Sequence, residues 1–399
     1  MHDGFRLITM KPALRLFTLL ILCLFTLSGY AQNSVYLSKA AETLGKIRQF
    51  YPSGQLGLFN ENYPNDAKAE VTYLVNRDTA VHRKVAYLWP TSGLFSGVNA
   101  LLKATKDPKY AIYLNDTIIP GICKYFDATR APFCYQSYIA AAGHSDRYYD
   151  DNVWLAIDFL ESYHLTGNKD YLNKSIETWQ FIISGWTEEQ GGGIFWCEQK
   201  KGSKNTCSNA PSAVLALQLF EATKDRIYFD WGEKIYRWTK TTLQDTTDNL
   251  YFDNISLSGK ISKAKYTYNS GQMLQAAALL YKITGKEPYL TDARKIAKSA
   301  IQYFSEDFFT PEGKKIRLFK NRGNWFNAIL VRGYKELYAL DKNEDYLKIF
   351  RDNLDFVWDH VRDEKGLFVK NWSGEDKTTQ RRWLLDQAAM VELFATLQK

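Results

Sequence analysis

The stretch Val214-Leu215-Ala216-Leu217-Gln218-Leu219-Phe220, followed shortly by Thr223-Lys224-Asp225-Arg226-Ile227-Tyr228, decides the fold expected for this chain of 399 residues. The first segment is apolar nearly all round, as a helix buried on two sides must be. The second segment is a polar turn. After the equivalent turn at 166–171, apolar residues recur at i, i+4, i+7 and i+11, namely Leu172, Ile176, Trp179 and Ile183. That spacing predicts an outer helix with one buried face, so the unit is a helical hairpin.

The same turn recurs along the chain. It is found at 105–110, 166–171, 223–228, 284–289 and 341–346, and its closing tyrosines are 61, 57, 61 and 57 positions apart. A fixed period of this size indicates repeated supersecondary units. We expect inner helices near 92–105, 151–165, 209–222, 269–283, 325–340 and 383–398, and outer helices near 35–51, 108–126, 169–184, 226–243, 287–304 and 343–361. The predicted fold class is all-α, an (α/α)6 toroid of six helical hairpins, with an open superhelix as the alternative.

Residues 1–31 are expected to be a signal peptide. Lys11 and Arg15 precede the apolar run 16–25, and Gly29-Tyr30-Ala31 places small residues at the two positions that a signal peptidase reads. The run is shorter than the roughly 20 residues of a membrane span. We therefore expect residues 32–399 to form a single domain, exported to the periplasm, the cell surface or the medium, without stable membrane insertion.

Charge and composition narrow the class of protein. The formal net charge is +7, and removal of the signal leaves 48 basic and 43 acidic residues, or +5, interleaved along the chain. Nucleic-acid binding is therefore not expected. The aromatic content of 11 Trp, 26 Tyr and 23 Phe is more unusual. Flat rings of this kind pack in cores, and they also stack on the apolar faces of pyranosides.

Four cysteines remain after the signal. Because export makes disulfides possible, we expect Cys197 to pair with Cys207 across a Lys-rich stretch. A Cys123–Cys134 bridge is less favoured, since Cys123 is expected on a helix with unsuitable geometry. Neither pair has a C-x-x-C spacing and the five histidines are scattered, so no metal site is predicted.

Long connections lead from the outer helices back to the inner ones, at 127–149, 186–208, 250–268 and 308–325. They should gather at one end of the ring, where the adjacent acids Asp150 and Asp151 also begin a helix. Loops of this length are usually functional. Neighbouring carboxyl groups among aromatic rings tend to split into one protonated and one ionised member, as glycosidic bond cleavage requires. The alternative is that one acid is only a helix N-cap.

Several segments together resemble glycoside hydrolase family 76. They are Ser145-Asp146-Arg147-Tyr148-Tyr149-Asp150-Asp151-Asn152-Val153-Trp154, Gly191-Gly192-Gly193-Ile194-Phe195-Trp196 and Ser208-Asn209-Ala210-Pro211, extended by 266–271 and 331–334. The resemblance covers most of the mature chain and implies an (α/α)6 fold and a retaining endo-α-1,6-mannanase. It further implies that Asp150 is the nucleophile and Asp151 the general acid/base, with α-mannan polysaccharide or oligosaccharide as substrate and no cofactor. Residues 89–97 depart from the aromatic helix start that is frequent in the family, which puts the subsite they line in doubt.

Other residues are candidates for substrate binding because they lie on or near the expected inner helices or in the long loops. Their polar or aromatic side chains could satisfy mannose hydroxyls or stack on the ring. These candidates are Tyr149, Trp196, Asn209, Asp253, Tyr268, Asn269, Trp325 and Arg332, with Asp386 and Trp154 in addition. For each, a role in capping or packing is the alternative.

Two other functions compete with hydrolysis of mannan. A non-catalytic carbohydrate-binding toroid would keep the aromatic loops but would not need the acid pair. Another (α/α)6 sugar enzyme, such as an unsaturated glycuronyl hydrolase or an epimerase, is the nearer rival, although an epimerase should present paired histidines. We expect the protein to act as a monomer.

Overall fold

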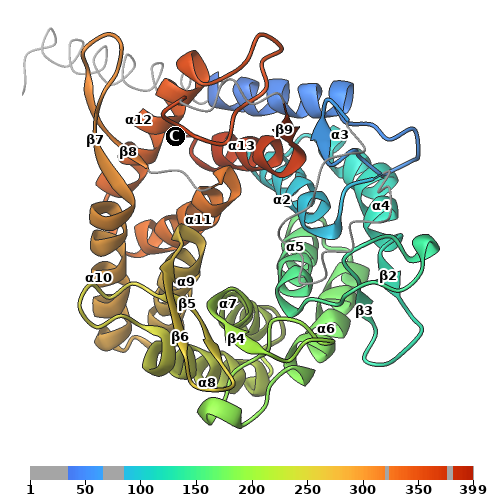
Figure 1. Cartoon of the computed structure of the whole chain (residues 1–399), viewed down its shortest axis with the longest axis vertical. Coiled ribbons are helices and arrows are strands. Elements are labelled where there is room, and N and C mark those ends of the chain that lie inside the picture. The colour runs from blue at the N-terminus through green and yellow to red at the C-terminus, as the bar shows by residue number, and fades with distance from the viewer. Residues whose placement is uncertain (1–34, 66–84, 320–322, 375–380, 399) are drawn as a thin grey trace, which may run out of the picture.

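The computed structural model describes residues 35–65, 85–319, 323–374 and 381–398, so the expected signal peptide lies outside the described residues. Helices form two concentric layers (Figure 1). The inner layer consists of α2 (Leu88–Thr105), α5 (Tyr149–Thr166), α7 (Thr206–Thr223), α9 (Thr267–Thr284), α11 (Asn324–Asp341) and α13 (Leu384–Thr396). The outer layer consists of a helix over residues 35–50, α3 (Pro108–Tyr113) with α4 (Ile119–Cys123), α6 (Lys169–Ser184), α8 (Arg226–Leu243), α10 (Glu287–Phe304) and α12 (Asp345–His360).

The inner helices form a closed ring, in the order α2, α5, α7, α9, α11, α13 and back to α2. Glycines allow two of the contacts to be very close. A Cβ at Gly93 of α2 would lie 2.3 Å from Leu385 Cδ1 on α13, and one at Gly271 of α9 would lie 2.6 Å from Leu330 Cα on α11. The predicted toroid is confirmed, and closure rules out the open superhelix.

The recurring turn has a shared chemistry that explains the repeat. Inner helices end on a residue in the left-handed conformation, which is Lys106, Gly167, Lys224, Gly285 or Lys342. In three of the turns the next residue caps the outer helix. Asp107 accepts from the backbone N–H of Lys109 at 3.0 Å, and Asp225 accepts from that of Ile227 at 3.1 Å. This chemistry explains why the outer helices at 169–184 and 226–243 have the predicted bounds. The helix at 287–304 also has its predicted bounds, with Pro288 in its first turn in place of a capping side chain.

One outer helix differs from the prediction. The helix expected over 108–126 is interrupted by a π-helical turn, η1 (Leu114–Ile118). Pro120 has no backbone N–H to donate to the carbonyl of residue 116, so the regular α-helical pattern cannot continue through it. The helix resumes as α4 and ends at Cys123.

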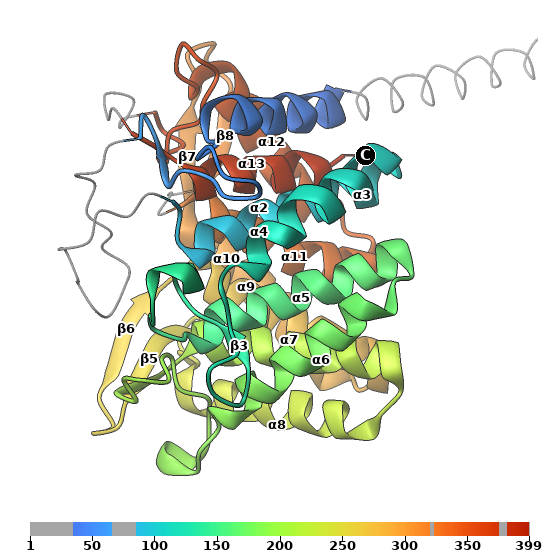
Figure 2. The same cartoon turned by 90° about the vertical axis from the view of Figure 1, so that its right-hand side faces the viewer.

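The long connections carry short antiparallel strands that the all-helical prediction did not include. They are β2 (Phe126–Asp127) with β3 (Cys134–Tyr135), β4 (Ser203–Asn205) with β5 (Phe252–Ser256) and β6 (Ile261–Lys265), and β7 (Ser305–Phe309) with β8 (Lys315–Phe319). β1 (Asn62–Tyr63) pairs with β9 (Arg382–Trp383), joining the two ends of the ring. The connections lie at one end of the toroid, as Figure 2 shows for β3, β5 and β6. This end, where the inner helices begin, is called the mouth below.

Candidate active site

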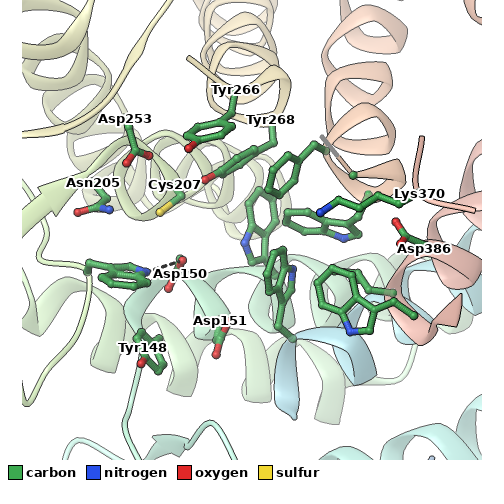
Figure 3. A pocket seen from close by; sticks show the side chains of 18 of the residues that line it. Tyr148, Asp150, Asp151, Asn205, Cys207, Asp253, Tyr266, Tyr268, Lys370 and Asp386 are labelled. Atoms are coloured by element: carbon green, nitrogen blue, oxygen red, sulfur yellow. Dashed lines mark hydrogen bonds between the residues drawn. The ribbon is translucent and has the colours of Figure 1, made fainter. Parts of the chain in front are cut away.

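A cavity of about 610 Å³ opens at the mouth of the toroid. This size is in the range of small-molecule sites, roughly 300–1,000 Å³. All six inner helices contribute to its lining, through Trp89 of α2, Asp150 and Asp151 of α5, Cys207 of α7, Tyr268 of α9, Trp325 of α11 and Asp386 of α13. Figure 3 shows how the polar side chains converge on this space from several elements.

The two adjacent aspartates lie in the first turn of α5. The N-cap residue is Tyr148, whose side chain makes no capping bond, so the reading of either aspartate as the N-cap is wrong. Asn152 fixes the helix start, since its Nδ2 donates to the carbonyls of Tyr135 and Tyr148, each at 2.8 Å. The helix start therefore presents both carboxyl groups to the cavity, with neither aspartate as the N-cap residue.

The two carboxyl groups have different surroundings. Trp196 Nε1 donates to Asp150 Oδ2 at 3.0 Å, while Asp150 Oδ1 is buried without a hydrogen-bond partner in the described structure. Burial raises the pKa of Asp150, but hydrogen bonds from the Cys207 thiol, from Trp196 and from backbone N–H groups oppose the rise. Burial also raises the pKa of Asp151, and there the charge of Asp150 adds to the rise. The pair therefore favours an ionised Asp150 beside a protonated Asp151.

Aromatic rings form one wall of the cavity. Trp325 lies edge-on to Trp89 and to Trp154, with ring centroids 5.3 and 5.0 Å apart, and Tyr268 packs on Phe326 at 4.3 Å. Such edge-to-face packing holds each ring in place. The wall therefore offers fixed apolar surfaces next to the acid pair, as a site for a sugar ring requires.

A third acid lies across the cavity from the pair. Asp253 of β5 accepts from Asn254 Nδ2 at 2.8 Å. Burial raises the pKa of Asp253, and the side-chain amides of Asn254 and Asn269 oppose the rise. Tyr266, Tyr268 and Asn205 complete this polar side (Figure 3).

The structure brings six of the predicted residues to the cavity besides the acid pair. They are Trp196, Asp253, Tyr268, Trp325 and the additional candidates Asp386 and Trp154. The Trp154 side chain has both of its expected roles, since it packs against Trp325 of α11 and also lines the cavity.

Three predicted binding residues were wrongly placed. Tyr149 turns away from the cavity and stacks on Phe181, with ring centroids 4.7 Å apart. Asn209 clamps the loop before α7 by bonding the backbone N–H and carbonyl of Ile194 at 2.7 and 2.9 Å. Arg332 lies two turns along α11 and forms a bidentate ion pair with Glu392 at the far end of the ring.

Asn269 is a different case. It is fully buried in α9, and neither atom of its side-chain amide has a hydrogen-bond partner among the described residues. Asn269 therefore lies behind the cavity wall and does not line the cavity.

Several lining residues were missed by sequence reasoning. They include Glu61, Trp89, Tyr148, Asn205, Cys207, Asn254, Tyr266, Phe326, Lys370 and Trp383. Tyr148 and Tyr266 are the residues immediately before α5 and α9, so a correct helix start would have pointed to them. Trp383 belongs to β9 and Glu61 directly precedes its partner strand β1, a pairing that no sequence pattern indicated.

The expected Cys197–Cys207 bridge is wrong, because Cys123, Cys134, Cys197 and Cys207 are all free thiols. Cys207 lies in the first turn of α7 and lines the cavity beside Asp150. Cys197 instead lies in the loop, 3.6 Å from Gln199 Oε1. The polar stretch between them forms β4, which pairs with β5 and so needs no covalent closure.

Two searches of the described ranges, 35–65, 85–319, 323–374 and 381–398, bear on cofactors and membranes. No group of three or more His, Cys, Asp and Glu side chains there is arranged to hold a metal ion. None of the helices there is long and apolar enough to cross a bilayer.

Comparison with known proteins places these features in context. Residues 30–398 match the family model "Glycosyl hydrolase family 76". A similar solved structure is the glycoside hydrolase family 76 (mannosidase) Bt3792 from Bacteroides thetaiotaomicron VPI-5482, with 31% identity, coverage of 91% of this chain and 98% of that chain, and a TM-score of 0.83. Another is an inactive variant, altered at two consecutive aspartates, of the α-1,6-mannanase GH76A of Salegentibacter sp. HEL1_6 in complex with α-1,6-mannotriose; identity is 25%, coverage 91% and 99%, and the TM-score 0.73.

Curated relatives match over shorter regions. The mannan endo-1,6-alpha-mannosidase DCW1 of Saccharomyces cerevisiae is 28% identical over 125 residues, which cover 29% of this chain and 28% of that protein. The meiotically up-regulated gene 191 protein of Schizosaccharomyces pombe is 30% identical over 197 residues, 45% of this chain and 43% of that protein. The matched regions thus span less than half the length of these relatives.

Proposed function

The chain belongs to glycosyl hydrolase family 76, and on this premise we propose that it is an endo-acting α-1,6-mannanase that retains the anomeric configuration. The observation that carries the proposal is the pair Asp150 and Asp151, which line one cavity, where Asp150 is hydrogen-bonded by Trp196 and the charge of Asp150 adds to the raised pKa of Asp151. Retaining glycosidases need such a division between an ionised nucleophile and a protonated acid.

The Salegentibacter enzyme supports the assignment of the pair. Its variant described as inactive carries substitutions at two consecutive aspartates and is in complex with α-1,6-mannotriose. Asp150 and Asp151 are the only two consecutive aspartates in the present sequence. If the reaction of that mannanase depends on its two adjacent aspartates, Asp150 and Asp151 are the residues that would do the same here.

In the first step, the ionised Asp150 attacks the anomeric carbon of a mannose unit through Oδ1, the oxygen without a hydrogen-bond partner. Trp196 meanwhile holds Oδ2 at 3.0 Å and fixes the orientation of the carboxylate. Asp151 donates its proton to the departing glycosidic oxygen as the C–O bond breaks. The products are a covalent mannosyl ester of Asp150 and a shortened chain with a free hydroxyl group.

In the second step, water replaces the ester. Asp151, now ionised, accepts a proton from the water as its oxygen attacks the anomeric carbon and the bond to Asp150 breaks. Two displacements at the same carbon restore the original configuration. Carboxyl groups and water supply every proton and electron pair, so these steps draw on no metal or organic cofactor.

The rest of the cavity suits a neutral sugar chain. The rings of Trp89, Trp325 and Phe326 can stack on pyranoside faces, and the polar side with Asp253, Asn205 and Tyr268 can accept or donate to hydroxyls. Because all six inner helices of one chain line the cavity, a monomer contains a complete site. We propose α-1,6-linked mannan or its oligosaccharides as the substrate.

Export is part of the same proposal. A polysaccharide does not cross a membrane unaided, so an enzyme that cleaves within it must be where the polymer is. Residues 1–31 have the charge and apolar pattern of a signal peptide. We propose delivery to the periplasm, the cell surface or the medium.

Digestion of linear α-1,6-mannan tests the proposal, with products followed over time by chromatography. Endo-action predicts an early ladder of short oligosaccharides. Release of mannose alone would replace the endo assignment by an exo one. Binding of mannan without any cleavage would instead support the carbohydrate-binding alternative.

A further inference from the structure

A buried lysine lies directly behind the loop that carries Trp196. Lys204, in β4, has no exposed surface, yet its ammonium makes three hydrogen bonds to backbone carbonyls. Nζ donates to Thr187 O at 2.9 Å, to Glu189 O at 2.5 Å and to Gly192 O at 2.5 Å. The ammonium also lies over the rings of Phe195 and Trp238, 5.1 and 6.0 Å from their centroids. The three carbonyl groups and two aromatic rings form a cation-binding cage, which the Lys204 ammonium occupies.

Lys204 binds a backbone segment whose conformation is unfavourable on its own. Gln190, Gly191, Gly192 and Gly193 all have positive φ, from 59° to 134°. A Cβ at Gly193 would lie 2.5 Å from Trp238, so this residue cannot be exchanged for one that would stiffen the loop. Three successive glycines lose much conformational entropy when they are ordered. An external clamp is needed to offset that loss.

The clamp connects to the nucleophile through a short series of contacts. The residue before Lys204, Ser203, accepts a hydrogen bond from the backbone N–H of Trp196 at 3.2 Å. The glycine loop, residues 187–193, precedes Trp196 in the chain and leads directly into it. Trp196 Nε1 then donates to Asp150 Oδ2 at 3.0 Å. Two residues of β4 thus hold the backbone around Trp196: Lys204 binds the loop before it, and Ser203 bonds Trp196 itself.

We infer that Lys204 is a positioning residue for catalysis, whose ammonium holds the glycine loop so that Trp196 orients the nucleophile Asp150. The inference rests on the proposed function, because it assigns a role in that reaction. Lys204 lies outside the cavity and touches no substrate. Burial lowers the pKa of Lys204 to about 8, opposed by the charges of Glu189 and Glu188, so the ammonium stays charged at neutral pH.

The test is a double-mutant cycle between Lys204 and Trp196. Lys204→Ala should lower kcat on α-1,6-mannan by about tenfold, no more than loss of the Trp196 hydrogen bond itself, with a smaller change in KM. Trp196→Phe should cost about tenfold, since it removes one hydrogen bond to a charged group. If Lys204 acts through Trp196, the double variant should be little worse than Lys204→Ala alone. If the losses in kcat of the two single variants instead multiply in the double variant, the inference is wrong.

Chemical rescue gives a second, independent reading. Lys204→Ala lacks three carbons and the ammonium, which are the atoms of n-propylammonium. Adding n-propylammonium should restore kcat with saturation, whereas tetramethylammonium, which has no N–H donor, should not. Equal effects of both cations would show a general salt effect and contradict the role of the carbonyl cage.

A matched control and a structural readout complete the experiment. Lys201→Ala, an exposed lysine three residues away, should leave kcat unchanged. Hydrogen exchange of residues 187–196 should increase in Lys204→Ala and not in Lys201→Ala. If the wild-type protein fails to cleave mannan, the proposed function fails, while the exchange measurement still decides whether Lys204 holds the loop. If Lys204→Ala does not fold, Lys204→Met, which keeps the apolar part of the side chain, replaces it in the double-mutant cycle with Trp196.

Discussion

The two ends of the toroid use acidic residues in opposite ways. At the mouth, Asp150 and Asp151 are enclosed by protein, yet among the described residues neither forms an ion pair. At the far end a second cavity, of about 490 Å³, also contains buried acids, but there Glu392 is held by both Arg332 Nε and Nη2, at 2.6 and 3.0 Å. The same inner helices supply both sets.

The contrast is between the acid pair at the mouth and Glu392 at the far end, which is held by Arg332. Asp158, also at the far end, accepts a hydrogen bond from Ser96 Oγ at 2.6 Å instead. An acid with a bound guanidinium stays ionised and is unavailable for proton transfer. An acid that is buried without a cation can exchange a proton near neutral pH, at a cost in stability. Substitutions at the two ends should therefore produce opposite phenotypes, loss of activity at the mouth and loss of stability at the far end.

The largest expected effect is at Asp150. Asp150→Ala should lower kcat on α-1,6-mannan by about 10⁴-fold or more, because it removes the attacking group. Thermal unfolding should change little, since the side chain lies in the cavity. The control is Asp158→Asn, which alters an acid of the same helix at the far end and should leave kcat unchanged. A near-normal rate for Asp150→Ala would remove this residue from the mechanism.

The second prediction separates the roles of the two mouth acids. Asp151→Ala should lose about 10²- to 10⁴-fold in kcat on mannan, but less on an aryl mannoside whose leaving group needs no proton. Azide should restore turnover of the aryl mannoside and give a mannosyl azide of retained configuration, because azide attacks without a base. NMR of the product gives the configuration. Formation of an inverted azide by this variant, or of a retained azide by Asp150→Ala, would reverse the assignment.

At the far end the expected loss is one of stability. Arg332→Met should lower the free energy of unfolding by about 3 kcal/mol, because it leaves Glu392 buried without its partner. Urea denaturation measures the change, and kcat of the folded protein should be that of the wild type. The double variant Arg332→Met with Glu392→Leu should recover much of the loss. A selective fall in kcat would show that the far end participates in catalysis and would break the comparison.

The smallest effect concerns the pH dependence of stability. Burial raises the pKa of Asp158 to about 7, opposed by the charge of Arg332 and a hydrogen bond from Ser96 and assisted by Glu392 and Glu161. Between its ordinary pKa near 4 and about 7, the folded state binds more protons than the unfolded state, so this group makes stability fall as pH rises. Asp158→Asn should flatten that slope by up to about 1.4 kcal/mol per pH unit. Urea titrations at several pH values measure it; an unchanged slope would contradict the assignment.

The architecture was largely predictable from sequence, because it depends on short-range signals. A polar turn with Asp or Asn as the cap, followed by one apolar stripe, defined α6 and α8 at their observed bounds, and a polar turn with Pro288 in the first helical turn defined α10. The strands β1 and β9 were not predicted, since they have two residues each and pair across most of the chain. Pairing at that separation leaves no local pattern.

The candidate site was predictable in its location but not in every side chain. Successive residues on a helix point about 100° apart, so a small error in a helix start changes which residue faces the cavity. α7 begins at Thr206 and not near residue 209, which puts Asn209 in the position of the loop clamp that Asn152 occupies in α5. Arg332 is eight residues into α11, or about 12 Å along its axis, which places it near the other end of the ring.

Closure of the ring has a consequence for how the protein forms during synthesis. The early hairpins can stack as they leave the ribosome, each on the one before, but the flank of α2 that contains Gly93 and Gly97 has no partner until α13 is made. The last helix then creates two interfaces at once, with α11 and with α2. A nascent chain short of residue 384 therefore presents apolar surface on both open flanks, and its protection in that interval falls to chaperones.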